Sequence, residues 1–430
     1  MPSDSVGALA SAPFLAGLNW GNVVSRCSYY GYGYHWIFFL LFKLTDNYRL
    51  IYFIIFLTGF LLCCLVSVIA YYIMIEFLHL NKSAMVVFMA AIIPTFRHNV
   101  HSIENEHAIF VVSWLAALVL FKLIDVREDK KSKNMYTIIL GIIMMYSMSI
   151  HERMFALWLG LVLTVIIVRL LCNISFVSEW IITLILGCGY VLHGIVRNVV
   201  AQNLWQVEDG EYIKNMSVVS SLNQSFCDSW GTIKATFDCM VTNIYKMAIS
   251  SYGMIIPGII LVIICFGAFF RTKGEKFKEY RTEENLKSFI VTLIFGITML
   301  VVMAGLATKG AASIWEGYST GEITWGYKHF FYVRYYWPFI GPCMIASFAF
   351  LIKHVNRLKK LFAICLVAFC SCFAYMWISI FPHLRSSNYL SGRLNYAPII
   401  SIINNTKTKA GENSNLLFTF SIMILCIVLL

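Results

Sequence analysis

Long apolar runs, separated by short charged loops, make up most of this chain. A helix needs about 20 predominantly apolar residues to cross the hydrocarbon core of a bilayer. Hydrophobic residues make up 59% of the sequence and charged residues only 13%, which is too few to cover a water-soluble surface. The sequence therefore excludes a disordered chain, a coiled coil and a soluble enzyme with one buried core, and it predicts a membrane protein.

We predict an all-α fold, a polytopic transmembrane bundle of about eleven spans that forms a single membrane-embedded domain over residues 1–430. The expected spans are residues 51–75, 84–96, 107–124, 135–149, 154–171, 180–196, 255–270, 289–306, 337–352, 361–380 and 416–430. Several runs are shorter than a full span, so their helices must extend into neighbouring polar residues. A shorter apolar run, residues 34–44, predicts an interfacial or re-entrant segment.

The orientation of the chain follows from its basic loops. Three short loops, which contain Lys130, Lys276 and Lys359, are dense in Lys and Arg, and alternation across the expected spans places all three on one side. Short basic loops stay in the cytoplasm, so the net charge of +11 predicts this topology rather than nucleic-acid binding. Residues 271–285 then form a cytoplasmic loop, and the expected location is a cell membrane, a bacterial plasma membrane in particular. The longer loops are expected to be external: residues 1–36, 197–252 and 308–334.

The first external loop begins with Asp4, which precedes a weakly amphipathic stretch of small residues, 6–18. This pattern predicts a juxtamembrane helix after residue 4, lying on the membrane surface and capped by Ser3 or Asp4. A Tyr/Gly run over residues 29–36, YYGYGYHW, then leads back into the membrane. In the alternative interpretation Asp4 is only a helix cap and the aromatic residues form an interfacial belt.

The second external loop, residues 97–107, has the sequence RHNVHSIENEH. It contains His101, Glu104 and Glu106, and imidazole and carboxylate groups this close together are suited to a divalent metal. The alternative is a solvated loop between two helices. Glu104 or Glu106 could instead orient an acceptor, so a metal cofactor stays an open possibility at this stage.

Two further motifs place Arg beside apolar sequence at the external ends of spans. In SIHERMF, Arg153 is suited to grip a phosphate with two hydrogen bonds while His151 donates a third. The alternative is a salt bridge between Arg153 and a carboxylate of another loop. In YVRYYWPFIGP, Arg334 lies among aromatic residues, which suits a phosphate head group with a sugar stacked beside it. Here the alternative is a snorkelling Arg within an aromatic belt.

Taken together, these motifs resemble those of the GT-C-fold membrane glycosyltransferases. That family has an acidic motif in its first external loop, a juxtamembrane helix, a Tyr/Gly-rich return, a His-x-Arg element and an Arg-Tyr-x-x-Pro element. The resemblance implies inverting transfer of a sugar from a polyprenyl-phosphate donor to a glycan, lipid or protein acceptor, with one carboxylate as base. The residues it implies are Asp4 as catalytic base, His151, Arg153 and Arg334 at the donor phosphate, and Tyr30, Tyr32 and Tyr335 stacking on sugar.

The sequence departs from this family in two places. Where the family often has Asp-Glu, this chain has Asp4-Ser5, and no transmembrane helix precedes the motif. We therefore expect a fragment that lacks the first transmembrane helix, a degenerate copy, or an unusual start codon. Two other classes remain open: a non-catalytic lipid or glycan transporter or flippase, and an O-antigen-type polymerase or ligase. No internal repeat favours the first, and external Arg residues spread over several loops disfavour the second.

The basic-loop pattern generates a topology prediction. Single cysteines introduced into the segment 197–252 should be labelled by an impermeant thiol reagent in intact cells, whereas cysteines beside Lys276 should be spared. The measurement compares labelling before and after permeabilisation, with Lys130 and Lys359 as further cytoplasmic positions. Labelling beside Lys276 alone would reverse the orientation and every external site assigned above.

Overall fold

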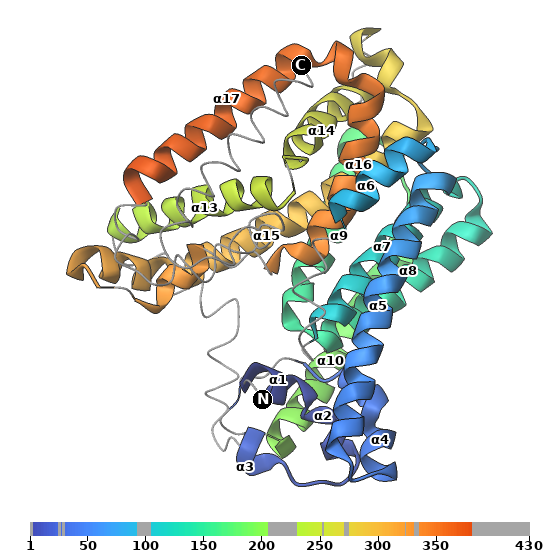
Figure 1. Ribbon diagram of the computed structural model, residues 1–430. Coiled ribbons are helices and arrows are strands. Elements are labelled where there is room, and N and C mark those ends of the chain that lie inside the picture. The colour runs from blue at the N-terminus through green and yellow to red at the C-terminus, as the bar shows by residue number, and fades with distance from the viewer. Residues whose placement is uncertain are drawn as a thin grey trace. The chain divides into compact units, whose positions relative to one another are not determined.

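The computed structural model describes residues 3–24, 27, 31–92, 105–204, 230–251, 253–270, 275–322, 324–330 and 335–380. Within these ranges the chain is helical and contains no strand, which confirms the predicted all-α class (Figure 1). The contacts within the structure group the chain into two compact units, where the sequence predicts one domain. Unit 1 contains the helices up to α10 and unit 2 the helices from α13 onward, and each is described by itself.

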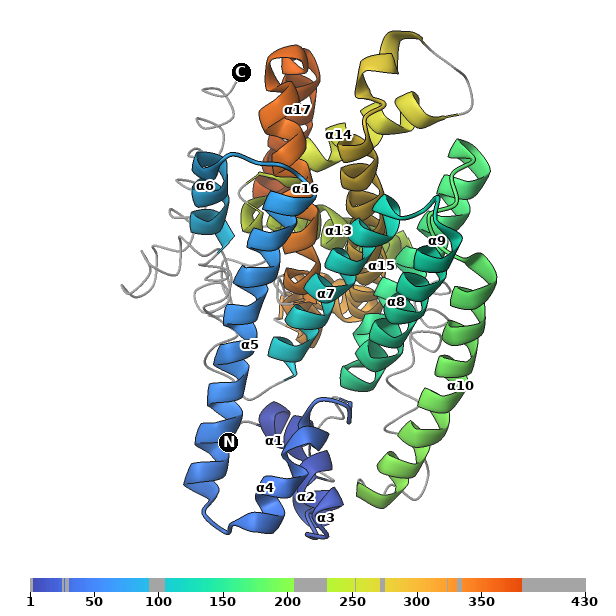
Figure 2. The same cartoon turned by 90° about the vertical axis from the view of Figure 1, so that its right-hand side faces the viewer.

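Unit 1 is a bundle in which α5, α7, α8 and α10 contact one another in that order (Figure 2). The interior helix is α7, which is buried over most of its length. Its helices are α1 (Ser3–Leu9), α2 (Ser11–Leu15), α3 (Gly21–Val24), η1 (His35–Phe38), α4 (Phe39–Leu44), α5 (Tyr48–Glu76), α6 (Lys82–Ile92), α7 (Glu106–Asp125), α8 (Lys130–Ile150), η3 (Glu152–Met154), α9 (Phe155–Ile167), η4 (Val168–Cys172) and α10 (Glu179–Leu204).

Unit 2 is arranged around its longest helix, α15, which contacts α13, α14, α16 and η6. Its helices are α13 (Trp230–Ser250), α14 (Ile255–Phe269), η5 (Glu275–Tyr280), α15 (Glu283–Thr320), η6 (Trp325–Phe330), α16 (Trp337–His354), η8 (Val355–Arg357), α17 (Lys359–Tyr375) and η9 (Met376–Ile380).

Local sequence signals set where several helices begin. The Asp129 carboxylate accepts hydrogen bonds from the amides of Lys131 and Ser132, both at 3.2 Å, and so caps α8. The Ser132 hydroxyl and these two amides hold the pKa of Asp129 below its usual value. In the same way the Thr282 hydroxyl accepts the amide of Asn285 at 3.2 Å and caps α15. Polar caps therefore begin helices whose later turns are strongly apolar.

Several helices are apolar enough to span a membrane, as predicted. By length and composition, five segments of the described chain could do so: Tyr48–Glu76, Glu106–Asp125, Glu152–Cys172, Glu179–Leu204 and Glu283–Thr320. The expected spans from 51–75 to 361–380 fall on described helices, although α14 and α17 are short and α6 is described only to Ile92. The last expected span, 416–430, lies outside the described residues. The count of about eleven spans therefore stays a prediction.

Some predicted loops are largely helical. Within the predicted loop 197–252, α10 continues to Leu204 and α13 covers Trp230–Ser250. Within 308–334, α15 continues to Thr320 and ends at Gly321, whose positive φ of 72° is the left-handed conformation that closes many helices. Polar residues interrupt the apolar runs in these helices, so a search for unbroken apolar runs does not detect their full length.

The N-terminal segment is helical where the sequence predicts a juxtamembrane helix. The helix predicted over 6–18 forms as two short pieces, α1 and α2, which end before Gly17 with its φ of 86°. The apolar run 34–44 forms η1 and α4. The placement of these short helices on a membrane surface remains a prediction.

A buried carboxylate joins three helices of unit 2. Asp238 of α13 is fully buried and accepts hydrogen bonds from the hydroxyls of Tyr318 at 3.0 Å and Tyr375 at 2.6 Å. Tyr318 lies in α15 and Tyr375 is the last residue of α17. The Asp238 side chain therefore links α13, α15 and α17. A buried carboxylate without such donors would be strongly destabilising.

This link predicts that Asp238→Ala lowers the free energy of unfolding by about 1–3 kcal/mol, because both tyrosine hydroxyls lose their acceptor. Thermal unfolding of the purified protein in detergent measures the effect. Glu322→Ala is the control, since Glu322 is exposed and such changes cost at most about 0.5 kcal/mol. Equal melting midpoints for the two variants would contradict a stabilising role for Asp238.

Candidate functional site

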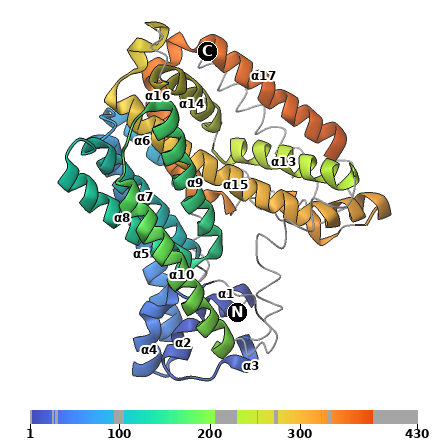
Figure 3. The same cartoon turned by 180° about the vertical axis from the view of Figure 1, so that it is seen from behind.

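One end of unit 1 gathers segments that are far apart in the sequence. The beginning of α7, the end of α8, η3 and the last turns of α10 lie there together with the N-terminal segment (Figure 2). Figure 3 shows α10 running beside α2 and α3, which it contacts. Three of the four motifs singled out in the sequence therefore meet at this end.

The Tyr/Gly return segment is bound to the last carbonyls of α8. The amides of Tyr32 and Gly33 both donate to the carbonyl of Ser149, at 2.8 and 2.7 Å. Gly31 has a φ of 101°, and a Cβ there would lie 2.2 Å from the carbonyl oxygen of Ile150. Only glycine permits this approach of one backbone to another, so the glycines of YYGYGYHW are required by the contact with α8.

Two side-chain hydrogen bonds join further segments to this contact. The Asn105 side chain donates to the carbonyl of Ile150 at 2.6 Å and ties the start of α7 to the end of α8. The Ser11 hydroxyl of α2 donates to the carbonyl of Tyr32 at 3.1 Å. The N-terminal helices, the return segment, α7 and α8 thus form one hydrogen-bonded assembly.

Two ion pairs cross this assembly. Arg153 pairs with Glu106, and the two side chains are only 7% and 13% exposed. Arg197 pairs with Glu152, with Nε and Oε1 2.7 Å apart. The set joins α7, η3 and α10 and carries no net charge. For Arg153, the structure therefore contains the salt bridge that the sequence left open as the alternative to a phosphate contact.

His151 lies between the end of α8 and η3. Its Nδ1 accepts a hydrogen bond from the amide of Arg153 at 3.1 Å and so caps η3. A neutral imidazole that accepts at Nδ1 carries its proton on Nε2. The hydrogen bond to the backbone therefore favours the tautomer of a neutral His151 that carries its proton on Nε2.

Tyr32 is part of the core of this region. Its ring is stacked on that of His193 with centroids 5.7 Å apart, its hydroxyl lies 3.2 Å from Nδ1 of His193, and Trp36 contacts it at 5.1 Å. It is only 6% exposed within a cluster that includes Val200 and Leu204. The ring of Tyr32 thus contacts other protein side chains, and the sugar stacking expected for Tyr32 stays a prediction.

The structure describes only some of the predicted site residues, and their roles stay predictions. It brings together Glu106, His151, Arg153 and Tyr32. Asp4 lies in α1 but its side chain is not described, and Tyr335 is half-buried in unit 2. The remaining predicted residues, Tyr30, His101, Glu104 and Arg334, lie outside the described residues. Over the described ranges no group of three or more His, Cys, Asp or Glu side chains is arranged to hold a metal ion.

Three residues of this assembly escaped the sequence analysis: Asn105, His193 and Arg197. His193 and Arg197 are four residues apart and so lie on one face of α10, at the end of an otherwise apolar run. That spacing is a usable signal, because paired polar residues at the end of a span are costly unless they have partners. Asn105 carries no comparable signal, since its role depends on the carbonyl of Ile150.

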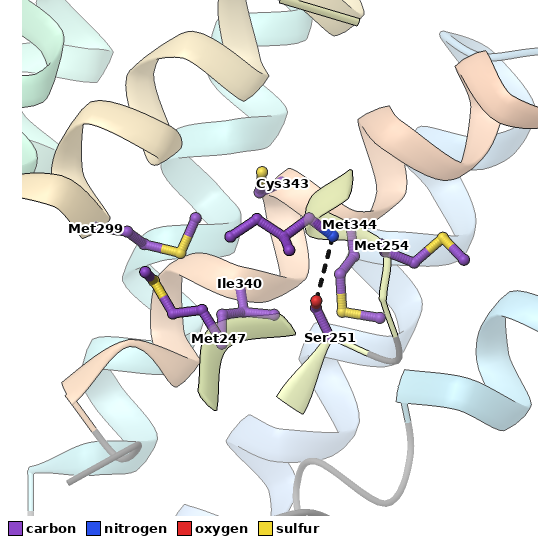
Figure 4. A pocket seen from close by; sticks show the side chains of 8 residues that line it. Met247, Ser251, Met254, Met299, Ile340, Cys343 and Met344 are labelled. Atoms are coloured by element: carbon purple, nitrogen blue, oxygen red, sulfur yellow. Dashed lines mark hydrogen bonds between the residues drawn. The ribbon is translucent and has the colours of Figure 1, made fainter. Parts of the chain in front are cut away.

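Unit 2 contains a small cavity between α13, α14, α15 and α16 (Figure 4). Its volume of about 10 Å³ leaves room for about one water molecule. Its walls are mostly thioether and aliphatic groups, and the Ser251 hydroxyl is already bound by the amide of Ile255 at 3.2 Å. Neither a sugar nor a lipid head group fits there, so this cavity is not the expected substrate site. The lining residues are Met247, Ser251, Met254, Ile255, Met299, Ile340, Cys343 and Met344.

No known protein family, curated protein or solved structure matches this chain. The resemblance to GT-C-fold enzymes consequently remains an expectation based on short motifs. Function has to be argued from the chemistry of the residues at the end of unit 1.

The close approach of Gly31 to α8 generates a stability prediction. Gly31→Ala should destabilise unit 1 by about 1–3 kcal/mol more than Gly17→Ala, because both glycines have positive φ but only Gly31 faces another backbone. Gly17 has open space around it and so controls for the cost of the left-handed conformation alone. Thermal unfolding in detergent provides the comparison, and equal melting temperatures would show that the return segment is not held against α8.

Proposed function

We propose that this chain is a membrane glycosyltransferase that moves a sugar from a polyprenyl-phosphate donor to an acceptor at the external face of a bacterial plasma membrane. One observation supports the proposal above all. The return segment and the SIHERM motif, which the family resemblance singles out separately, meet at one end of unit 1 beside the start of α7. The full proposal includes the membrane bundle of about eleven spans with all long polar segments outside.

The proposed reaction is an inverting displacement at the anomeric carbon of the sugar. The acceptor hydroxyl forms the new carbon–oxygen bond as the bond to the phosphate oxygen breaks, and the leaving polyprenyl phosphate takes that electron pair. The hydroxyl proton passes to a carboxylate base. A phosphate is already a good leaving group, so positive charge and hydrogen-bond donors are more useful there than a strong acid.

The roles of individual residues follow from this chemistry. Asp4 is the proposed base, while His151, Arg153 and Arg334 are proposed to contact the phosphate. In support, His151 has the tautomer that leaves a donor at Nε2, and Arg153 is a buried guanidinium. Glu106 is proposed to orient the acceptor or to hold a metal together with His101 and Glu104.

A transporter of lipid or glycan is the second candidate, and one observation favours it. The buried face of α13 carries Asp238 and Lys246, which are 0% and 5% exposed. Ionisable residues buried in membrane proteins often mark pathways for ions or substrates. Proteoliposomes loaded with a labelled lipid-linked sugar separate the two functions, since a transporter moves the sugar across the bilayer without breaking the glycosidic bond.

The assignment of Asp4 gives a sharp test of the enzyme. Asp4→Asn should reduce sugar transfer in membranes by at least about two to four orders of magnitude, because the amide cannot accept the acceptor proton. Membrane insertion should stay unchanged, since Asn has nearly the same shape as Asp and Asp4 lies in the first turn of α1. Asp46→Asn is the control, as Asp46 is exposed and precedes α5.

The outcomes separate the base from the reaction. Turnover like that of wild type in Asp4→Asn would remove Asp4 as the base and leave Glu104 or Glu106 as the next candidates. A wild-type chain that transfers no sugar from any polyprenyl-phosphate donor would overturn the proposed function itself.

A further inference from the structure

The ion pair between Arg153 and Glu106 raises a question that the proposed function does not answer. A guanidinium that is to bind a phosphate is already neutralised by a carboxylate, and both side chains are almost fully buried. We propose that Glu106 is a resident counter-ion, which the phosphate of the lipid donor displaces from Arg153. This inference rests on the proposed function and makes Glu106 the residue that sets specificity for a phosphate group.

The backbone around Arg153 stays fixed during such an exchange. The Arg153 amide is bound by His151, and the neighbouring Ile150 carbonyl is bound by Asn105. Glu152 is paired with Arg197 on α10, so this acid already has its own cation. The exchange therefore needs movement only of the Arg153 and Glu106 side chains.

Glu106 is placed where the loss of its cation costs least. It lies in the first turn of α7, where the free amides and the helix dipole stabilise a negative charge. A carboxylate released elsewhere in an apolar interior would keep the full cost of an uncompensated charge. The start of α7 thus provides a second position for the displaced carboxylate.

The same arrangement explains why a phosphate displaces Glu106 and weaker ligands do not. A phosphate presents several anionic oxygens to the planar fork of a guanidinium and accepts a further hydrogen bond from a neighbouring donor such as His151. An uncharged polyprenol offers no anion and cannot compete with a buried carboxylate. Glu106 therefore lowers the affinity for all lipids and leaves measurable binding only for those with a phosphate.

The chain offers a matched pair of variants for the test. Glu106→Gln and Glu152→Gln each remove one carboxylate from an arginine pair at the same end of unit 1, and both change the net charge by the same amount. Only Glu106→Gln removes the carboxylate that pairs with Arg153. Binding of C55 polyprenyl phosphate to the full chain in detergent micelles is measured for both variants and for wild type, with inorganic phosphate and C55 polyprenol as comparison ligands.

The Glu106→Gln variant should bind polyprenyl phosphate about tenfold more tightly than the Glu152→Gln variant does. Adding Arg153→Gln to both variants should remove this difference in affinity. Polyprenol binding should not change. A similar gain with inorganic phosphate would show that the phosphate alone is recognised, whereas a gain confined to polyprenyl phosphate would show that the lipid chain contributes; both outcomes support displacement.

Equal or weaker binding by Glu106→Gln would overturn the displacement and make the pair a purely structural link. Melting temperatures of the two variants show whether each is folded. A folded Glu106→Gln variant that binds no better than Glu152→Gln decides against displacement. Wild-type sugar transfer is measured in parallel. Persistent transfer with no gain in binding would reject this inference while leaving the proposed function intact, and the loss of both would reject both.

Discussion

The last carbonyl groups of α8 hold unit 1 together, because a helix leaves these acceptors without partners of its own. In water they would be solvated, but next to apolar helices they need donors from the protein. The carbonyl of Ser149 receives two amides of the return segment, and that of Ile150 receives the Asn105 side chain. Completing one helix end thus brings together segments that are more than a hundred residues apart in the sequence.

Charge pairing follows from the same shortage of water. Arg153 and Arg197 lie beside strongly apolar helices, where an isolated charge is costly. Each has a carboxylate from a different helical element, so the pairs also fix how α7, η3 and α10 are placed. A pair that is needed for folding in the absence of ligand is also a pair with which any anionic ligand must compete. The structural and functional interpretations of Arg153 are therefore linked rather than exclusive.

The features that the sequence predicted best are those that composition and the length of apolar runs determine. The predicted all-α class is confirmed over the described residues, and several helices are long and apolar enough to span a membrane, since both features follow from long apolar runs. The helix α13 was predicted as a loop because Asp238, Asn243 and Lys246 interrupt its apolar run, although they are buried on one face. Tyr32 was interpreted as an interfacial aromatic residue. Its burial depends in part on a contact with His193, and the two residues are too far apart in the sequence for a local pattern to reveal that contact. Partners of this kind are set by tertiary structure, which single-sequence patterns do not contain.

The two buried acidic groups described here differ in a way that bears on where an anionic substrate binds. Asp238 is satisfied by neutral hydroxyls of Tyr318 and Tyr375, so displacing it would release no cation for a ligand. Glu106 is satisfied by a guanidinium, and displacing it exposes a group with strong affinity for phosphate. When a phosphate replaces the carboxylate of an ion pair, new charge-assisted hydrogen bonds offset part of the free energy lost with the old pair. Replacing a carboxylate that is bound only by hydroxyl groups gives no such bonds to a cation. The proposed phosphate site therefore suits the end of unit 1, and the cluster around Asp238 is better suited to holding helices together.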